Sequence, residues 1–136
     1  MKIVLISILF SISIFVENTN ADADQSFIRN YGQWSKLGQS SKLAYVAGAF
    51  DELFNSMFAD SGGDAATSAD NDGIKTCVSE TGMNEQIMSQ MIDARYLKHS
   101  EEWTFGPASV LISSLLETCD PQIRLARVKL GLPAIR

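Results

Sequence analysis

Histidine and cysteine are scarce in this sequence, which has one histidine, His99, and two cysteines, Cys77 and Cys119. Zinc sites and most acid–base or nucleophilic centres bring several such residues together, so a lone histidine without a partner argues against that chemistry. No serine occupies a G-x-S-x-G elbow, and Gly62-Gly63 is too isolated to form a phosphate-binding loop. We therefore expect a binding or inhibitory protein that is not an enzyme and uses no metal or cofactor.

Basic residues are also too few for a protein that binds nucleic acid. The chain has 11 Lys and Arg against 16 Asp and Glu, a formal net charge of −5. Phosphate backbones are bound by clustered Lys and Arg, and no such cluster is present. The acidic balance excludes nucleic acid as the main partner and is compatible with a basic protein partner.

Long apolar runs are absent except at the N-terminus. Ile3–Val16 is an apolar run interrupted only by serines, and it follows a single lysine and precedes an A-x-A triplet at 21–23. This pattern predicts a signal peptide over 1–23, cleaved after Ala23, and export to the periplasm. The run is shorter than the ~20 residues of a spanning helix, so we expect no membrane association after cleavage. Cleavage removes one basic and two acidic residues and leaves a net charge of −4.

The two cysteines flank a predicted helical hairpin. Asn84–Lys98 and Pro107–Thr118 have helical character, with expected lengths of roughly 22 Å and 18 Å. If they pack antiparallel, the second segment returns the chain to the start of the first and brings Cys77 and Cys119 together. In an oxidising compartment such a pair is most simply a disulfide. Closing a loop of this length stabilises a fold by about 4 kcal/mol in the chain-entropy model.

The clearest amphipathic helix is predicted over 43–58. Its apolar residues recur at i, i+3, i+4 and i+7 over four turns, and Ser40 or Ser41 can cap it. Gly48 lies in its middle, where glycine costs about 1 kcal/mol relative to alanine. One reason to keep a glycine there is the close approach of another helix.

The rest of the chain also has helical periods, and no run alternates with the period of a strand. A first short segment, 24–37, places three aromatic residues on the core, and Pro121 can begin a last helix. We therefore expect an all-α fold, a small bundle of four to five helices with one disulfide-clamped helical hairpin, in one domain over 24–136. The three aromatic residues are Phe27, Tyr31 and Trp34.

Asp60–Gly73 contains no large apolar residue and is predicted to be an exposed acidic loop. The run Asp70-Asn71-Asp72-Gly73 has a composition typical of part of a calcium-binding loop. Aligned on Gly73, an EF-hand would need a glutamate where this chain has Ser79. A solvated acidic loop is the better interpretation.

Several short stretches resemble a known family. The heptapeptide Y-V-A-G-A-F-D at 45–51 is followed by the two cysteines and by several short stretches around the hairpin. Together they resemble the Rap/Tai immunity family, small exported all-helical proteins of Gram-negative bacteria that protect against peptidoglycan amidases delivered by type VI secretion. Two differences are the lack of a cysteine before Cys77, where members often carry a further one, and the residues Val78 and Thr118, where members often have proline. The matching residues around the hairpin are Gln86, Tyr96-Leu97, His99-Ser100-Glu101, Pro107-Ala108 and Leu115-Leu116.

The resemblance implies inhibition by occlusion, in which an exposed loop enters the cleft of a secreted cell-wall amidase and blocks it. Exposure and composition suggest two contact regions, the acidic loop and the hairpin turn. An alternative is a periplasmic stress or holdase-type protein, or an envelope accessory protein without a toxin partner. A homodimer also stays open, since a short helical domain can leave apolar surface uncovered. The candidate contact residues are Asp60, Asp64, Asp70 and Asp72 in the loop and His99, Glu101, Glu102 and Trp103 in the turn.

Overall fold

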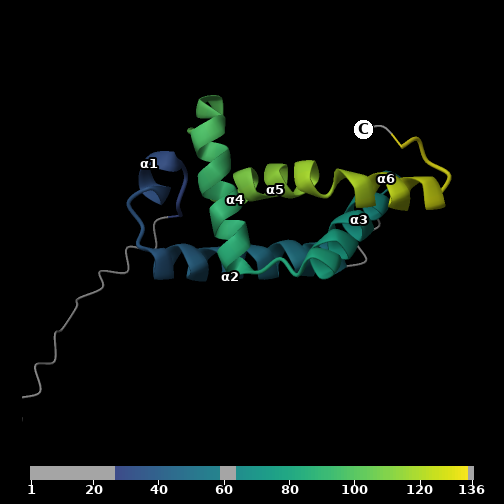
Figure 1. Cartoon of the computed structure of the whole chain (residues 1–136), viewed down its shortest axis with the longest axis horizontal. Helices are drawn as coiled ribbons and strands as arrows, with labels where there is room; N and C mark the ends of the chain where they lie inside the picture. Colours follow the sequence, from purple (N-terminus) through teal and green to yellow (C-terminus); the bar gives the residue numbers. More distant parts are fainter. Residues whose placement is uncertain (1–26, 59–63, 135–136) are drawn as a thin grey trace, which may run out of the picture.

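The computed structural model describes residues 27–58 and 64–134, and every regular element in these ranges is a helix. This confirms the all-α prediction, with six α-helices rather than four or five (Figure 1). The predicted leader, 1–23, lies outside the described residues. The helices are α1 (Tyr31–Trp34), α2 (Gln39–Phe58), α3 (Ala65–Thr81), α4 (Glu85–Lys98), α5 (Pro107–Thr118) and α6 (Asp120–Lys129), with a short 3-10 turn at Ser100–Glu102.

The helices form an open frame in which α5 and α6 follow one another along one edge and α2 runs along the opposite edge (Figure 1). Helix α4 crosses this frame near one end, where it contacts both α2 and α5, and α3 packs against α6 at the other end. Within the described ranges no helix is both long and apolar enough to cross a membrane.

Local sequence sets the ends of the central helices. The side chain of Asn84 accepts a hydrogen bond from the backbone N–H of Ile87 at 3.0 Å, which caps α4. Gly82 ends α3 with a φ of 63°, a left-handed conformation that glycine adopts at little cost. Pro107 is the first residue of α5, where its missing N–H removes no helical bond.

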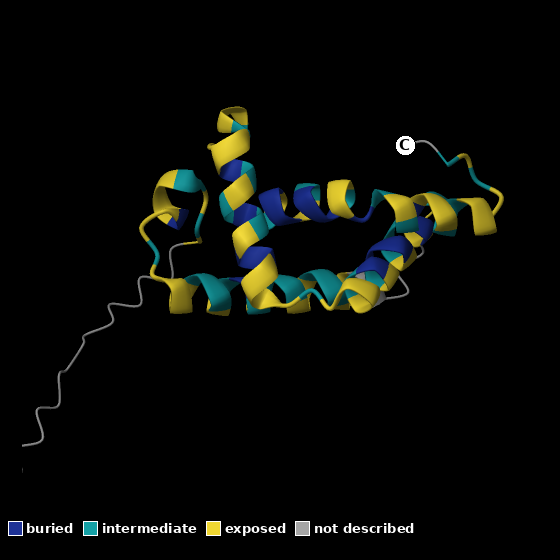
Figure 2. Cartoon of the chain, in the orientation of Figure 1, coloured by how far each residue is buried: buried dark blue, intermediate teal, exposed yellow. Residues whose placement is uncertain are grey.

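The core lies between α4 and α5 and extends along both to α1 and α6 (Figure 2). Each helix contributes at least one fully buried apolar side chain, but α2 contributes only Val46 among its described side chains. Phe27, which was expected on the core, is 81% exposed, so that part of the aromatic stripe is wrong. The largest buried side chains are Trp34, Met88, Ile92, Tyr96, Leu111, Leu115 and Ile123.

The predicted loop over Asp60–Gly73 is wrong for its described second half, because α3 begins at Ala65. The Asp64 side chain caps this helix by accepting a bond from the Thr67 N–H at 2.8 Å. Gly73 is buried, and a Cβ placed on it would lie 2.4 Å from the Cα of Ile123. Glycine therefore allows α3 and α6 to pack backbone against backbone, a tertiary contact that overrides its weak helix propensity.

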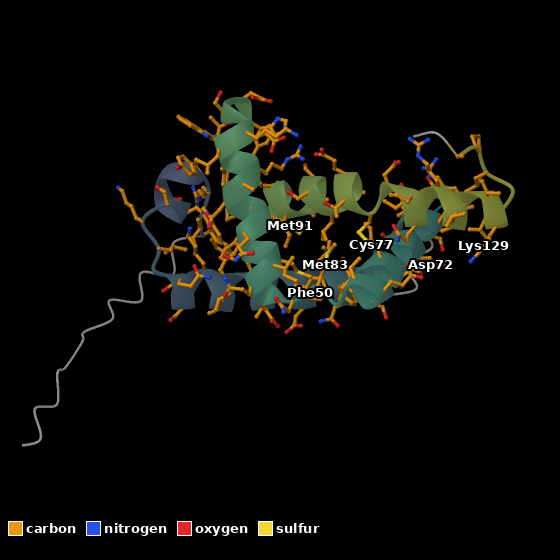
Figure 3. All side chains as sticks on the ribbon, viewed as in Figure 1. Phe50, Asp72, Cys77, Met83, Met91 and Lys129 are labelled. Carbon is orange, nitrogen blue, oxygen red and sulfur yellow. A yellow bond between two sulfur atoms is a disulfide. The ribbon has the colours of Figure 1, made fainter. Side chains whose placement is uncertain are left out.

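Cys77 and Cys119 form the predicted disulfide, with their Cα atoms 5.5 Å apart (Figure 3). Both residues are buried. Cys77 lies in the last turns of α3 and Cys119 between α5 and α6, so the bond closes the path through α4 and α5. Such a bond is typical of a protein that folds in an oxidising compartment.

Candidate binding surface

The predicted acidic contact region is not one surface in the structure. Asp60 lies outside the described residues, and Asp64 is used as a helix cap. Asp70 lies on α3 and accepts a hydrogen bond from Arg127 Nε at 2.7 Å, so it holds α6 rather than facing solvent. Asp72 is exposed on the same helix, with Lys75 Nζ at 3.9 Å. The prediction that these residues share an exposed loop is therefore wrong, since the described members are on a helix or cap it.

The predicted turn, by contrast, forms a defined structure at the C-terminal end of α4. Figure 1 shows this end projecting beyond the rest of the frame, away from α3. The adjacent carboxylates of Glu101 and Glu102 diverge, as expected. Glu101 lies 2.9 Å from His99 Nδ1, whereas both oxygens of Glu102 accept bonds from Arg95 Nε and Nη2 at 2.7 Å.

These contacts lower the pKa of both carboxyl groups. For Glu102 the main cause is the hydrogen bonding to Arg95, and for Glu101 it is a backbone N–H followed by the bond to His99. The same Glu102 contact raises the pKa of Arg95. Both carboxyl groups therefore stay ionised at pH values below the usual pKa of glutamate.

Trp103 is held in place on three sides and is still 47% exposed. Its indole Nε1 donates to the carbonyl of Tyr96 at 2.7 Å, and its own carbonyl accepts from the Tyr31 N–H at 3.0 Å. Its ring stacks on Tyr31, with centroids 5.1 Å apart and planes 24° from parallel. The turn thus presents a large aromatic side chain whose conformation is fixed before any partner arrives.

Tyr96 joins the turn to the core. It is fully buried on α4, and its hydroxyl donates to the carbonyl of Phe105 at 2.6 Å. Burial of the ring and hydroxyl raises the pKa of Tyr96 to about 12. Because Tyr96 also receives the Trp103 indole, one core residue fixes both sides of the turn.

The turn is apolar as well as rigid. Leu97 is 75% exposed and Phe105 is 53% exposed, and both lie within a few residues of Trp103. We define the aromatic turn as residues 97–105. The helical period places Leu97 on the buried face with Tyr96 at its edge, whereas in the structure Tyr96 is buried and Leu97 is exposed. Phe105 and Trp103 could be recognised from sequence as aromatic residues in an otherwise polar turn.

A small groove lies beside the aromatic turn, between α4 and α5. Its volume is about 200 Å³. Arg95 Nη1 donates to Glu117 Oε2 at 2.8 Å at this groove, and Lys98 Nζ lies 3.9 Å from the other oxygen. The helical period places Arg95 on the solvent side of α4, but its side chain is only 16% exposed. The lining residues are Met91, Ala94, Arg95, Lys98, His99, Ser114, Glu117 and Thr118.

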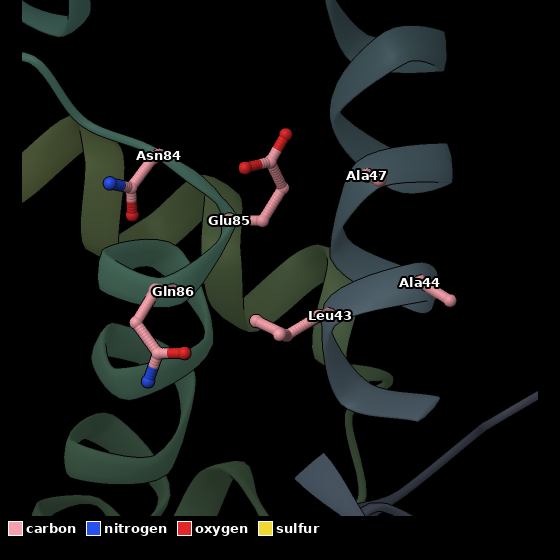
Figure 4. A pocket seen from close by; sticks show the side chains of 6 residues that line it. All are labelled: Leu43, Ala44, Ala47, Asn84, Glu85 and Gln86. Atoms are coloured by element: carbon pink, nitrogen blue, oxygen red, sulfur yellow. The ribbon is translucent and has the colours of Figure 1, made fainter. Parts of the chain in front are cut away.

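A second groove, open to solvent and about 470 Å³ in volume, lies between α2 and the start of α4. Figure 4 shows Leu43 extending from α2 towards α4 and Glu85 between the two helices. Asn84 is used as the helix cap, and Gln86 accepts a bond from Gln39 at 3.3 Å. The side chains that line it present one carboxylate and two amides that already have partners, without a nucleophile beside a base.

No metal site is evident either. Among the residues described by the structure, no group of three or more His, Cys, Asp and Glu side chains is placed to hold a metal ion. In comparisons with known proteins, no family model, curated protein or solved structure matches the chain. The aromatic turn is therefore the candidate functional surface because of its geometry.

Proposed function

We propose that this chain is an exported immunity-like protein that inhibits a peptidoglycan amidase effector by placing the aromatic turn in the active-site cleft of the enzyme. The observation that carries the proposal is Trp103, a side chain that is half exposed although its ring, indole nitrogen and backbone carbonyl all have fixed partners. Inhibition by occlusion needs no catalytic group on the inhibitor. It needs a rigid and complementary projection.

Rigidity matters because binding must offset the entropy of every group that becomes ordered. Immobilising a flexible side chain costs roughly 0.5–1.5 kcal/mol, and a preorganised turn avoids much of that cost. Tryptophan is among the residues that most often dominate the binding energy of protein interfaces. The exposed Leu97 and Phe105 add apolar surface around it. The turn thus has the composition and the order of an inhibitory loop.

The compartment and the resemblance support the same proposal. The disulfide is the kind of bond that persists outside the cytosol, where a cell-wall amidase acts. The stretches that resemble the Rap/Tai family include His99, Ser100 and Glu101, which form the first part of the aromatic turn after α4. The proposed contact surface therefore includes residues on which the resemblance rests.

A holdase-type or envelope accessory role is the second candidate, and one observation favours it. Phe50, Met83 and Met91 are only partly buried where they pack against the core (Figure 3). Methionine side chains adapt to irregular partners, so loosening of the helices would expose an adaptable apolar surface. This role predicts binding of many unfolded proteins in acid, whereas inhibition predicts one tight partner at neutral pH.

The test is inhibition of an identified amidase by the exported chain with its disulfide intact. We expect hydrolysis of purified peptidoglycan to stop at equimolar protein, and Trp103→Ala to weaken inhibition at least 30-fold, about 2 kcal/mol for an interface hot spot. Leu125→Ala is the matched control, because Leu125 is an exposed apolar residue on α6, and it should change inhibition less than twofold.

The proposal is wrong if amidases encoded beside this gene and in related strains are neither bound nor inhibited. It is also wrong if Trp103→Ala and Leu125→Ala inhibit equally well. Suppression of the aggregation of several unrelated unfolded proteins, without amidase inhibition, would support the holdase-type role.

A further inference from the structure

The groove between α4 and α5 is continuous with the aromatic turn, because Lys98 and His99 belong to both and Arg95 in the groove bonds Glu102 in the turn. Arg95 contributes donors to each side. Nε and Nη2 are fixed by the two oxygens of Glu102 in the turn, and Nη1 is directed to Glu117 in the groove. The guanidinium is therefore oriented by the turn and offers its remaining edge to the groove.

The carboxylate that now occupies this edge is open to solvent. The Glu117 side chain is 62% exposed, and its second oxygen lies 3.9 Å from Lys98 Nζ, a group that is itself 71% exposed. An exposed pair such as Lys98–Glu117 contributes roughly 0–1 kcal/mol, because water screens it and the side chains lose freedom. Glu117 can therefore leave the groove when another carboxylate takes over its 2.8 Å contact with Arg95.

We infer that this groove is a binding site for a glutamate or aspartate side chain of the protein that binds the aromatic turn. The inference rests on the proposed function for the identity of that protein. The incoming carboxylate replaces Glu117 between Arg95 Nη1 and Lys98 Nζ. Glu117 marks the chemistry of the site, because it shows that a glutamate carboxylate fits both cations.

The size and lining of the groove agree with a single acidic side chain. A volume of about 200 Å³ is too small for a helix, and Met91 and Ala94 provide apolar contacts for the methylene groups of the ligand. Guanidinium groups bind carboxylates through fixed planar donors, which gives direction as well as charge. Lys98 lies beside Arg95 in the lining and gives an incoming carboxylate a second positively charged partner.

The first experiment uses the chain alone, with propionate as a probe for a glutamate side chain. In an NMR titration, we expect propionate to bind the Glu117→Gln variant at least fivefold more tightly than the unchanged chain. The shifts should centre on Arg95 Nε–H and the methyl groups of Met91 and Ala94. Lys98→Ala in the same background should weaken binding at least threefold. Propionamide, the uncharged counterpart, should cause no saturable shift.

Absence of a saturable propionate shift in the Glu117→Gln variant would overturn the carboxylate site. Equal shifts with propionamide would do the same. Because Glu117 and Lys98 are exposed, both variants should fold, and unchanged circular dichroism verifies this. This experiment is independent of the amidase, so its result stands even when the proposed function fails.

The second experiment measures inhibition of the amidase. Glu117→Gln should strengthen inhibition about threefold to tenfold, and Lys98→Glu should weaken it at least tenfold. Lys129→Glu on α6 is the control, since it changes the same charge far from the groove (Figure 3). If propionate binds but neither Glu117→Gln nor Lys98→Glu changes inhibition, the groove does not bind an acidic side chain of the amidase. If Trp103→Ala has no effect, the proposed function fails instead.

Discussion

The two ends of the molecule are held together by different kinds of interaction. At the disulfide end, α3 and α6 pack with Gly73 against the backbone of Ile123, and Cys77 is bonded to Cys119. At the turn end, α1 and the aromatic turn are joined by hydrogen bonds and stacked rings around Tyr96. Both ends leave apolar side chains in solvent, Leu125, Val128 and Leu130 at the first and Leu97, Trp103 and Phe105 at the second. At the second end, however, Trp103 is held by two hydrogen bonds and a stacked ring.

The difference indicates how a small domain can expose apolar side chains and still keep them ordered. Backbone packing and a covalent bond stabilise the fold at a distance from the aromatic turn. Polar contacts then fix the exposed side chains without burying them. Arg95 and Tyr96 do this from α4, one through its guanidinium and the other through its carbonyl and hydroxyl. Under the proposed function, the covalent bond and the binding surface thus lie at separate ends.

Removing the disulfide should have the largest effect and should separate the two ends. Replacing both cysteines by alanine frees a loop with a sequence separation of 42 residues, which lowers the free energy of unfolding by about 4 kcal/mol in the chain-entropy model. Urea unfolding followed by circular dichroism measures this loss. Trp103 fluorescence in the absence of urea should stay unchanged, because its contacts lie at the other end.

The comparison breaks down if the double variant remains folded but its Trp103 emission and quenching match those of the unfolded chain. That outcome would mean that the aromatic turn depends on the disulfide rather than on Tyr96 and Tyr31. Trp34→Phe in both backgrounds removes the only other indole and makes the fluorescence specific to Trp103.

Two glycines give the next largest contrast. Gly73→Ala should lower the free energy of unfolding by about 3 kcal/mol, because its Cβ would lie within 3 Å of three atoms of Ile123, two of them in the backbone. Gly48→Ala should raise it by up to about 1 kcal/mol, because Gly48 is exposed and has no neighbour within 4 Å. Urea titrations of both variants measure the two signs. Similar effects at both positions would show that helix propensity, not close packing, determines the role of Gly73.

Sequence predicted the elements with local signals and missed the long-range contacts. Helices α4 and α5 carry a cap, a proline start and apolar periods, and their bounds agree closely with expectation. The cysteine pair was found because no other pairing exists within the chain. In contrast, Gly48 was a candidate for close helix packing, and Gly73 was placed in a loop. The assignment of close packing to Gly48 was wrong, because nothing lies within 4 Å of its Cβ position. The assignment of Gly73 to a loop was wrong because its packing partner, Ile123, is 50 residues away in the sequence.

Only part of the candidate surface was predicted, because its other contacts also join residues that are far apart in the sequence. The aromatic turn was recognised from Trp103 and its neighbours, but the role of Arg95 was missed. Its partners, Glu102 and Glu117, are 7 and 22 residues away, on a turn and on another helix. A helical period places Arg95 on the outer face of α4, and only the path of the chain after Lys98 brings a carboxylate over it.

The smallest effect expected at pH 7 concerns Tyr96, which connects the turn end to the core. Tyr96→Phe removes the bond to the Phe105 carbonyl and should cost about 1 kcal/mol at pH 7. The larger consequence is in alkali. Tyrosine has a pKa near 10 when unfolded, and burial raises the pKa of Tyr96 to about 12 in the folded chain. The folded state therefore holds the proton more tightly, and stability that is complete below pH 10 is lost as the pH rises towards 12.

By pH 11 that loss amounts to about 1.4 kcal/mol for Tyr96, and it should be absent in the Tyr96→Phe variant. Urea unfolding at pH 8, 10 and 11 measures it. Tyr45→Phe is the control, because burial also raises the pKa of Tyr45 but its hydroxyl does not bond the turn. Amide hydrogen exchange at pH 7 should increase at Phe105 in the Tyr96 variant only. If both variants leave exchange at the turn unchanged, Tyr96 stabilises the core alone, and the order of the aromatic turn comes from Arg95 and Tyr31.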